Sequence, residues 1–166
     1  MPNASSAPVV PTASPDPDPI AEAQRLLAAA HDSDVPVRLI GGLAVRLHVA
    51  DLPAALVREY KDIDLVTVQH GEQAASRLME TSGYVPNPEF NALNGHRRLM
   101  FADPFTQRQV DVFVGQFVMC HDIPITERLH LDPISIPLAE LLLTKLQVVE
   151  LNERDVQDTL AILLAH

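Results

Sequence analysis

The 166-residue chain has little of what marks several protein classes. It has no tryptophan and a single cysteine, so no disulfide can form within it, and a small disulfide-stapled fold is excluded. That cysteine, Cys120, ends the apolar run 117–120, which predicts a buried thiol rather than a nucleophile. No apolar stretch is long enough to span a bilayer, and no signal peptide precedes the first helix. We therefore expect a cytoplasmic protein with no membrane attachment.

Positive charge is also scarce. The chain has 12 Lys and Arg against 22 Asp and Glu, a net charge of −10 and an isoelectric point near 5.0. A protein that coats nucleic acid without sequence preference needs a basic face, so this class is disfavoured, although a local basic patch stays open. The hydrophobic content of 47% and the length fit one domain with a real core.

The 14 prolines are unevenly placed. Residues 1–19 are rich in Pro, Ala, Ser and Asp, a composition that cannot bury enough apolar area to offset chain entropy. We therefore predict a disordered tail over 1–19 and a single domain over 20–166, whose part from 136 to 166 is helical.

Hydrophobic periodicity predicts an α/β (α+β) fold, in which helices flank a small mixed β-sheet and a helical pair closes the C-terminus. The expected elements are a helix over 20–31, a strand over 35–40, a helix from 43, a connection or short helix over 50–57, a strand over 58–68, a helix over 72–82 ended by Gly83, an extended or loop segment over 84–88, a strand over 96–102, a turn over 103–106, a strand over 109–114, a helix over 137–151 and a last helix capped by Asn152.

Asp62 and Asp64 alternate with apolar residues in the segment 62–68. Residues i and i+2 of a strand share a face, so both carboxylates project the same way. Two such carboxylates repel each other, and a hard divalent cation such as Mg²⁺ removes that cost. The alternative is an edge strand whose outer face is simply solvated.

Asp111 lies inside the strongly β-prone run from Val110 to Val114. An unpaired charge there is expensive, and a metal ion shared with Asp62 and Asp64 would give it a partner. The alternative is an edge position that faces water. No histidine cluster has zinc spacing, and the chain contains no serine elbow, Walker lysine loop or dinucleotide fingerprint.

Gly41 and Gly42 stand between an expected strand and a helix start. Glycine lets an anion approach the backbone, and a helix N-terminus favours negative charge, but a tight turn without a ligand explains the pair equally well. Lys145 lies on an otherwise apolar helix face, where its stem can pack while its ammonium reaches water. Asp155 has a capping explanation, which does not extend to Asp158 one turn later.

Taken together, these motifs resemble the polymerase-beta-like nucleotidyltransferase superfamily. The matching residues are Leu39-Ile40-Gly41-Gly42, Asp62-Ile63-Asp64 and Val110-Asp111-Val112, although the gap from Gly42 to Asp62 is longer than in the commonest form. Within the superfamily the chain is most similar to AbiEii/AbiGii-type toxins and related minimal nucleotidyltransferases. Their further motifs are matched by Gly41-Gly42-Leu43-Ala44, Arg58, Lys61, Lys145 and Arg154-Asp155-Val156-Gln157-Asp158. The resemblance covers residues 36–165.

The resemblance implies a role for each matching residue. Asp62, Asp64 and Asp111 would hold two Mg²⁺ ions, and Asp111 would also help to activate an acceptor hydroxyl. The resemblance further implies nucleotide binding by Gly41, Gly42, Arg58, Lys61 and Lys145. It implies that Asp155 and Asp158 position Lys145 or the acceptor.

We therefore expect a Mg²⁺-dependent enzyme that moves a nucleoside monophosphate from an NTP to a hydroxyl on RNA, a protein or a small molecule. A tRNA end could be held by local cations such as Arg97 and Arg98. The toxin-type resemblance implies a toxin–antitoxin role with an antitoxin partner. The alternatives are a catalytically inactive nucleotide- or partner-binding protein on the same fold, and a structural α/β protein with solvated aspartates.

Overall fold

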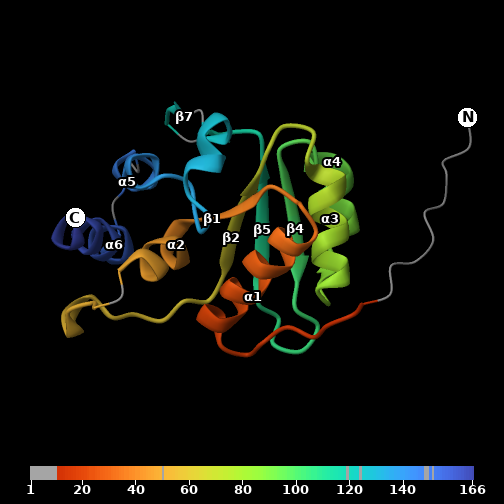
Figure 1. Ribbon diagram of the computed structural model, residues 1–166, viewed down its shortest axis with the longest axis horizontal. Coiled ribbons are helices and arrows are strands. Elements are labelled where there is room, and N and C mark those ends of the chain that lie inside the picture. The colour runs from red at the N-terminus through yellow and green to blue at the C-terminus, as the bar shows by residue number, and fades with distance from the viewer. Residues whose placement is uncertain (1–10, 50, 119, 124, 148–149, 151) are drawn as a thin grey trace, which may run out of the picture.

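The computed structural model describes residues 11–49, 51–118, 120–123, 125–147, 150 and 152–166, and its centre is a five-stranded mixed sheet (Figure 1). The strand order is β1-β2-β5-β4-β3. Only the β2–β5 pair is parallel; the other neighbours are antiparallel. The strands are β1 (Val37–Ile40), β2 (Ile63–Thr67), β3 (Val85–Pro86), β4 (Arg98–Ala102) and β5 (Gln109–Val114). The predicted small mixed sheet is confirmed.

Six α-helices and two 3₁₀ helices surround the sheet in the described part of the chain. They are α1 (Pro19–Asp32), α2 (Gly41–His48), η1 (Ala54–Leu56), α3 (Glu72–Thr81), α4 (Pro88–Asn94), η2 (Thr126–Leu131), α5 (Leu138–Leu146) and α6 (Glu153–Ala165). A second, two-stranded sheet pairs β6 (Phe117–Val118) with β7 (Asp122–Ile123). Helices α2, α5 and α6 gather beside β1, and α3 and α4 lie at the other end of the sheet (Figure 1). None of the helices described is long and apolar enough to cross a membrane.

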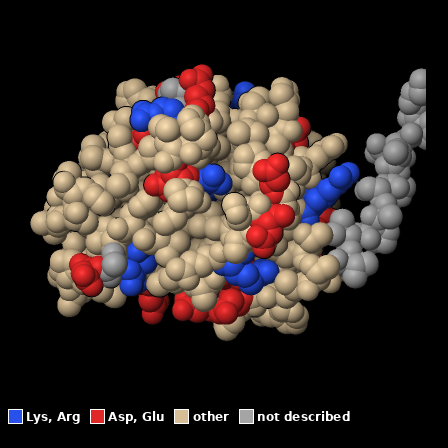
Figure 2. All heavy atoms as spheres, viewed as in Figure 1, with Lys and Arg blue, Asp and Glu red and all other residues tan. Residues whose placement is uncertain are grey.

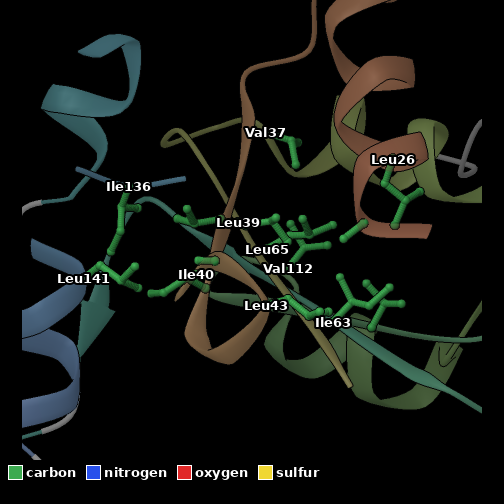
Figure 3. Close-up of a cluster of buried hydrophobic side chains, with 14 of the residues drawn as sticks. Leu26, Val37, Leu39, Ile40, Leu43, Ile63, Leu65, Val112, Ile136 and Leu141 are labelled. Carbon is green, nitrogen blue, oxygen red and sulfur yellow. The ribbon is translucent and has the colours of Figure 1, made fainter. Parts of the chain in front are cut away.

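Acidic and basic side chains are interspersed on the face shown in Figure 2. Beneath them, the core is built from the apolar alternation of the strands. Ile63 and Leu65 of β2 are fully buried, as is Val112 of β5, and they belong to the same buried cluster as Leu26 of α1 (Figure 3). Burying such side chains stabilises the fold by about 1.5–3 kcal/mol each. The central strands β2 and β5 are therefore held rigidly, and their register is fixed.

This register brings the acidic residues together. Asp64 on β2 is the partner of Asp111 on β5, and Ile40 at the end of β1 is the partner of Asp64 on its other side. Three strands thus contribute neighbouring positions to one place on the sheet, next to the start of α2.

Several elements differ from the sequence predictions. Strand β2 covers only Ile63–Thr67 of the strand predicted over 58–68, so Asp62 lies just before the strand and is exposed. Helix α5 ends at Leu146, with Gln147 as its C-cap, rather than continuing to 151; residues 148, 149 and 151 lie outside the described residues. The second helix begins at Gly41 instead of residue 43, and α4 was not predicted. Asn87 starts α4 because its side chain accepts a hydrogen bond from the backbone N–H of Phe90.

The N-terminal segment and the cysteine also differ from expectation. Thr12 donates its backbone N–H to Thr81, and Arg108 donates to the carbonyl oxygens of Asp16 and Pro17, so residues 11–18 lie against the domain. The predicted tail thus remains a prediction only for residues 1–10, which lie outside the described part. Cys120 is exposed, not buried, because it follows β6 at the surface.

Candidate active site

The turn from β1 into α2 touches the carboxylate of Asp64. Gly41 has a φ of +77°, and a Cβ added to it would lie 2.7 Å from Asp64 Oδ2. Glycine is needed here both for the left-handed conformation and for the close approach. No side chain caps the N-terminus of α2, so its first backbone N–H groups are not taken by a capping side chain.

Gly42 is required by a different neighbour. A Cβ on Gly42 would collide with Nη2 of Arg58. The Arg58 guanidinium lies 4.3 Å from the centre of the Tyr60 ring and forms a two-pronged pair with Asp158. Arg58 is therefore fixed beside the helix start rather than free to swing into solvent.

Burial makes Asp64 costly to ionise. It raises the pKa of Asp64 to about 6, and the neighbouring charge of Asp111 adds to the shift. Lys145 and Arg98 act in the opposite direction, and Asp62 raises the pKa further. Such a carboxylate is held in an unfavourable charged state at neutral pH, which a bound cation would relieve.

Asp111 has partners of its own. Its side chain is 5% exposed, and it accepts hydrogen bonds from Arg98 Nε (3.0 Å), Arg98 Nη2 (2.6 Å) and Gln109 Nε2 (2.8 Å). The pair with Arg98 raises the pKa of the guanidinium above its ordinary value, chiefly through the hydrogen bond to Asp111. Arg98 is thus held in place by Asp111 and cannot swing out to a tRNA end.

Lys145 of α5 meets α6 at two carboxylates. Its Nζ lies 2.8 Å from Asp158 Oδ2 and 3.6 Å from Asp155 Oδ1. The Asp158 side chain is 3% exposed and also binds Arg58, so one buried carboxylate links α6, Lys145 and the segment before β2. Asn152 caps α6 as predicted, by accepting from the backbone N–H of Asp155.

Two adjoining hollows open around these groups. One, of about 300 Å³, is lined by Ile40, Gly41, Asp64, Phe113, Phe117, Thr144, Lys145, Asn152 and Asp155. The other, of about 210 Å³, is lined by Gly42, Leu43, Arg58, Tyr60, Lys61, Asp62, Asp64, Lys145, Asn152, Arg154 and Asp155. Asp64 and Lys145 border both hollows, which together form one cleft.

The residues present fit one Mg²⁺ ion better than two. Among the residues described, no group of three or more His, Cys, Asp and Glu side chains is arranged to hold a metal ion. Asp62 and Asp64 alone are a fitting pair, because Mg²⁺ is usually bound by one or two carboxylates, with waters and substrate phosphates as its other ligands. Asp111 does not fit a second ion, because Arg98 and Gln109 occupy its oxygens.

A solved structure shares this fold. The lincosamide antibiotic adenylyltransferase LnuA, bound to lincomycin, superposes with a TM-score of 0.59 over 86% of this chain and 95% of that chain, at 16% sequence identity. No protein-family model and no curated protein sequence matches the chain. The similarity shows that this chain shares its fold with an adenylyltransferase, while the superfamily stays a prediction. It does not extend to the AbiEii/AbiGii-type subgroup, which stays a prediction.

The structure thus brings most of the predicted site residues to one cleft. Gly41, Gly42, Arg58, Lys61, Asp62, Asp64, Lys145 and Asp155 line it, and Asp158 lies behind Lys145. Asp111 is adjacent on the sheet but engaged by Arg98. Sequence reasoning missed Phe113 and Phe117, whose rings meet edge to face at 5.0 Å, and the pairing of Arg98. The alternation of side chains along these strands was visible in the sequence. Which side chains face one another across the strands depends on the strand register.

Proposed function

We propose that the protein is a Mg²⁺-dependent nucleotidyltransferase that moves a nucleoside monophosphate from an NTP onto a hydroxyl group of a small molecule. One observation carries the proposal: the half-buried carboxylate of Asp64 lies against Gly41 at the start of α2, in a cleft that Lys145 also borders. This arrangement combines an ion-binding carboxylate with two features that favour phosphate oxygens, an open helix N-terminus and an ammonium group.

Each group has a task in phosphoryl transfer. The acceptor oxygen bonds to the α-phosphorus, the bond to the β-phosphate breaks, pyrophosphate leaves with the electron pair, and the hydroxyl proton is released to water. Such a reaction depends mainly on positioning and on neutralised charge. Gly41 and Gly42 leave room for phosphates, Lys145 and Lys61 offer positive charge, and Arg58 stiffens the wall.

Asp62 and Asp64 would hold the ion, which when bound supplies positive charge to the phosphate oxygens. Asp155 and Asp158 keep Lys145 in place by pairing with its ammonium. These carboxylates thereby position Lys145 rather than contact the nucleotide.

The cleft favours a small acceptor over RNA or a protein. Its larger hollow, of about 300 Å³, is walled by Phe113, Phe117 and Ile40, which suit an apolar ring or chain. The net charge of −10 repels a long polyanion, and Arg98 is engaged by Asp111. LnuA, on the same fold, is named for a lincosamide antibiotic. The comparison lends no support to an antitoxin partner.

A transfer assay tests the proposal. The protein is mixed with Mg²⁺, each α-labelled NTP in turn, and separate lincosamide, aminoglycoside, total tRNA and protein-extract acceptors. We expect label on a small-molecule acceptor, lost in Asp64→Asn and kept in Asp34→Asn, a change of an exposed aspartate outside the cleft. Label on tRNA or protein alone would overturn the choice of acceptor.

The second candidate is a nucleotide-binding protein without transferase activity, favoured by the pairing of Asp111 with Arg98. Saturable Mg-NTP binding without transfer to any acceptor would establish it. Absence of Mg-NTP binding would overturn both candidates and leave the fold as a structural α/β protein.

A further inference from the structure

Arg98 occupies the place where the sequence resemblance puts a second metal ion. Its guanidinium pairs with both oxygens of Asp111, the carboxylate next to Asp64 on the sheet. We infer that Arg98 replaces the second cation, so that the protein works with one divalent ion at Asp62 and Asp64 and with a fixed guanidinium at Asp111. This inference rests on the proposed function and specifies its charge arrangement.

The oxygens of Asp111 leave little room for a metal ion. A carboxylate has about four acceptor positions, and three are taken by Arg98 Nε, Arg98 Nη2 and Gln109 Nε2. With its side chain 5% exposed, Asp111 also has little access to the waters that complete the shell of Mg²⁺. A second ion would have to displace a two-pronged charge-assisted pair.

Arg98 is anchored on more than one side. The guanidinium carbon lies 5.3 Å from the ring centre of Phe113 and 5.8 Å from that of Phe90. On β4, Arg98 is the direct partner of Phe113 on β5, and Asp111 lies two residues away on the same face. Because Phe113 also lines the larger hollow, this packing holds the guanidinium beside the cleft wall.

The unused donors of Arg98 can act on a ligand. A guanidinium carries five N–H groups, and the pair with Asp111 uses one on Nε and one on Nη2. The structure shows no hydrogen bond from Nη1 to any of the described residues, and the side chain is 38% exposed. Its charge does not depend on pH, and its planar donors match phosphate oxygens. Arg98 can therefore neutralise phosphate charge where a metal ion would otherwise act.

Manganese titration tests the inference by counting ions. The full-length protein, in excess over methylene-bridged analogues of ATP, GTP, CTP and UTP in turn, is titrated with Mn²⁺ and followed by electron paramagnetic resonance. We expect one Mn²⁺ per protein–nucleotide complex and no coupling between ions. Two ions about 4 Å apart would show strong spin coupling. In Arg98→Met we expect the count to double and coupling to appear.

Matched variants separate the explanations. Arg97→Met removes the same charge from the neighbouring exposed arginine and should keep one ion, as should Arg98→Lys. If Arg98→Met does not fold, Arg98→Gln replaces it, since glutamine removes the charge and the two-pronged pair while it keeps a polar side chain on β4. Two coupled ions in the unmodified protein would overturn the inference and leave the proposed function standing. So would a single ion in both the unmodified protein and Arg98→Met, or Arg98→Gln where it is used instead. No ion bound with any analogue would overturn the proposed function itself.

Discussion

Replacing Asp64 by asparagine should stabilise the free protein while it abolishes transfer. The carboxylate lies in the cleft next to Asp111, and burial raises its pKa from 3.8 to about 6. The folded state therefore holds this proton more tightly than the unfolded chain does. At pH 8 both states carry the ionised form, and ionisation costs the folded state more. An asparagine at this position has no charge to bury.

The size of the effect follows from the pKa shift. About 2 pKa units correspond to roughly 3 kcal/mol, which is an upper limit because the asparagine amide must also be desolvated. We expect a gain of about 1–3 kcal/mol at pH 8. Because the folded pKa is raised, the penalty is fully present above about pH 6, falls to about half at pH 5 and vanishes below the unfolded pKa.

Urea unfolding at pH 8 and pH 5 measures this. At pH 8 the midpoint of Asp64→Asn should lie above that of the unmodified protein by roughly 1 M, and the gap should shrink at pH 5. Asp62→Asn is the matched control, because Asp62 is exposed and its replacement should move the midpoint much less. The reasoning is refuted if Asp64→Asn is no more stable at pH 8, or if its advantage is the same at both pH values.

Three further predictions concern the same cleft. Gly41→Ala should reduce transfer at least tenfold and lower the melting temperature, because the added Cβ meets Asp64 at 2.7 Å and φ is +77°; a normal rate would show that this approach is dispensable. Asp158→Asn should lower the free energy of unfolding, measured in urea, by about 3 kcal/mol, because it leaves the charges of Arg58 and Lys145 without their buried partner. A decrease below about 0.5 kcal/mol would contradict that role of Asp158. Adding Mg-NTP should raise the melting temperature of the unmodified protein but not of Asp64→Asn, as differential scanning fluorimetry would show; equal shifts would place the ion elsewhere.

Local chemistry made much of the fold predictable. The alternation from Gln109 to Val114 gave β5 its correct bounds, and the apolar run into Gly41 and Gly42 located the strand–helix turn. Helix α5 was predicted too long because apolar spacing continues past Leu146, and periodicity alone does not show where a helix stops packing. Helix α4 has a local start signal in the sequence, since the capping residue Asn87 is followed directly by Pro88.

The candidate site was less predictable where it depends on pairing between strands. The two-residue period of a strand predicted that Asp62 and Asp64 share a face, but β2 begins at Ile63, so Asp62 precedes the strand; both residues still line the smaller hollow. That Arg98 pairs with Asp111 depends on the β4–β5 register, and a shift by one residue would turn Arg98 to the opposite face. Sequence reasoning thus found the carboxylates but could not assign their partners.

The link between Arg58 and Asp158 joins residues 100 positions apart. Contacts of such long sequence separation form late, because closing a large loop costs entropy before the contact compensates for it. During synthesis, a nascent chain that has not yet reached α6 would already contain β1, β2 and β5 but would leave Lys145 and Arg58 unanchored. We therefore expect nucleotide binding to arise only after α6 has docked.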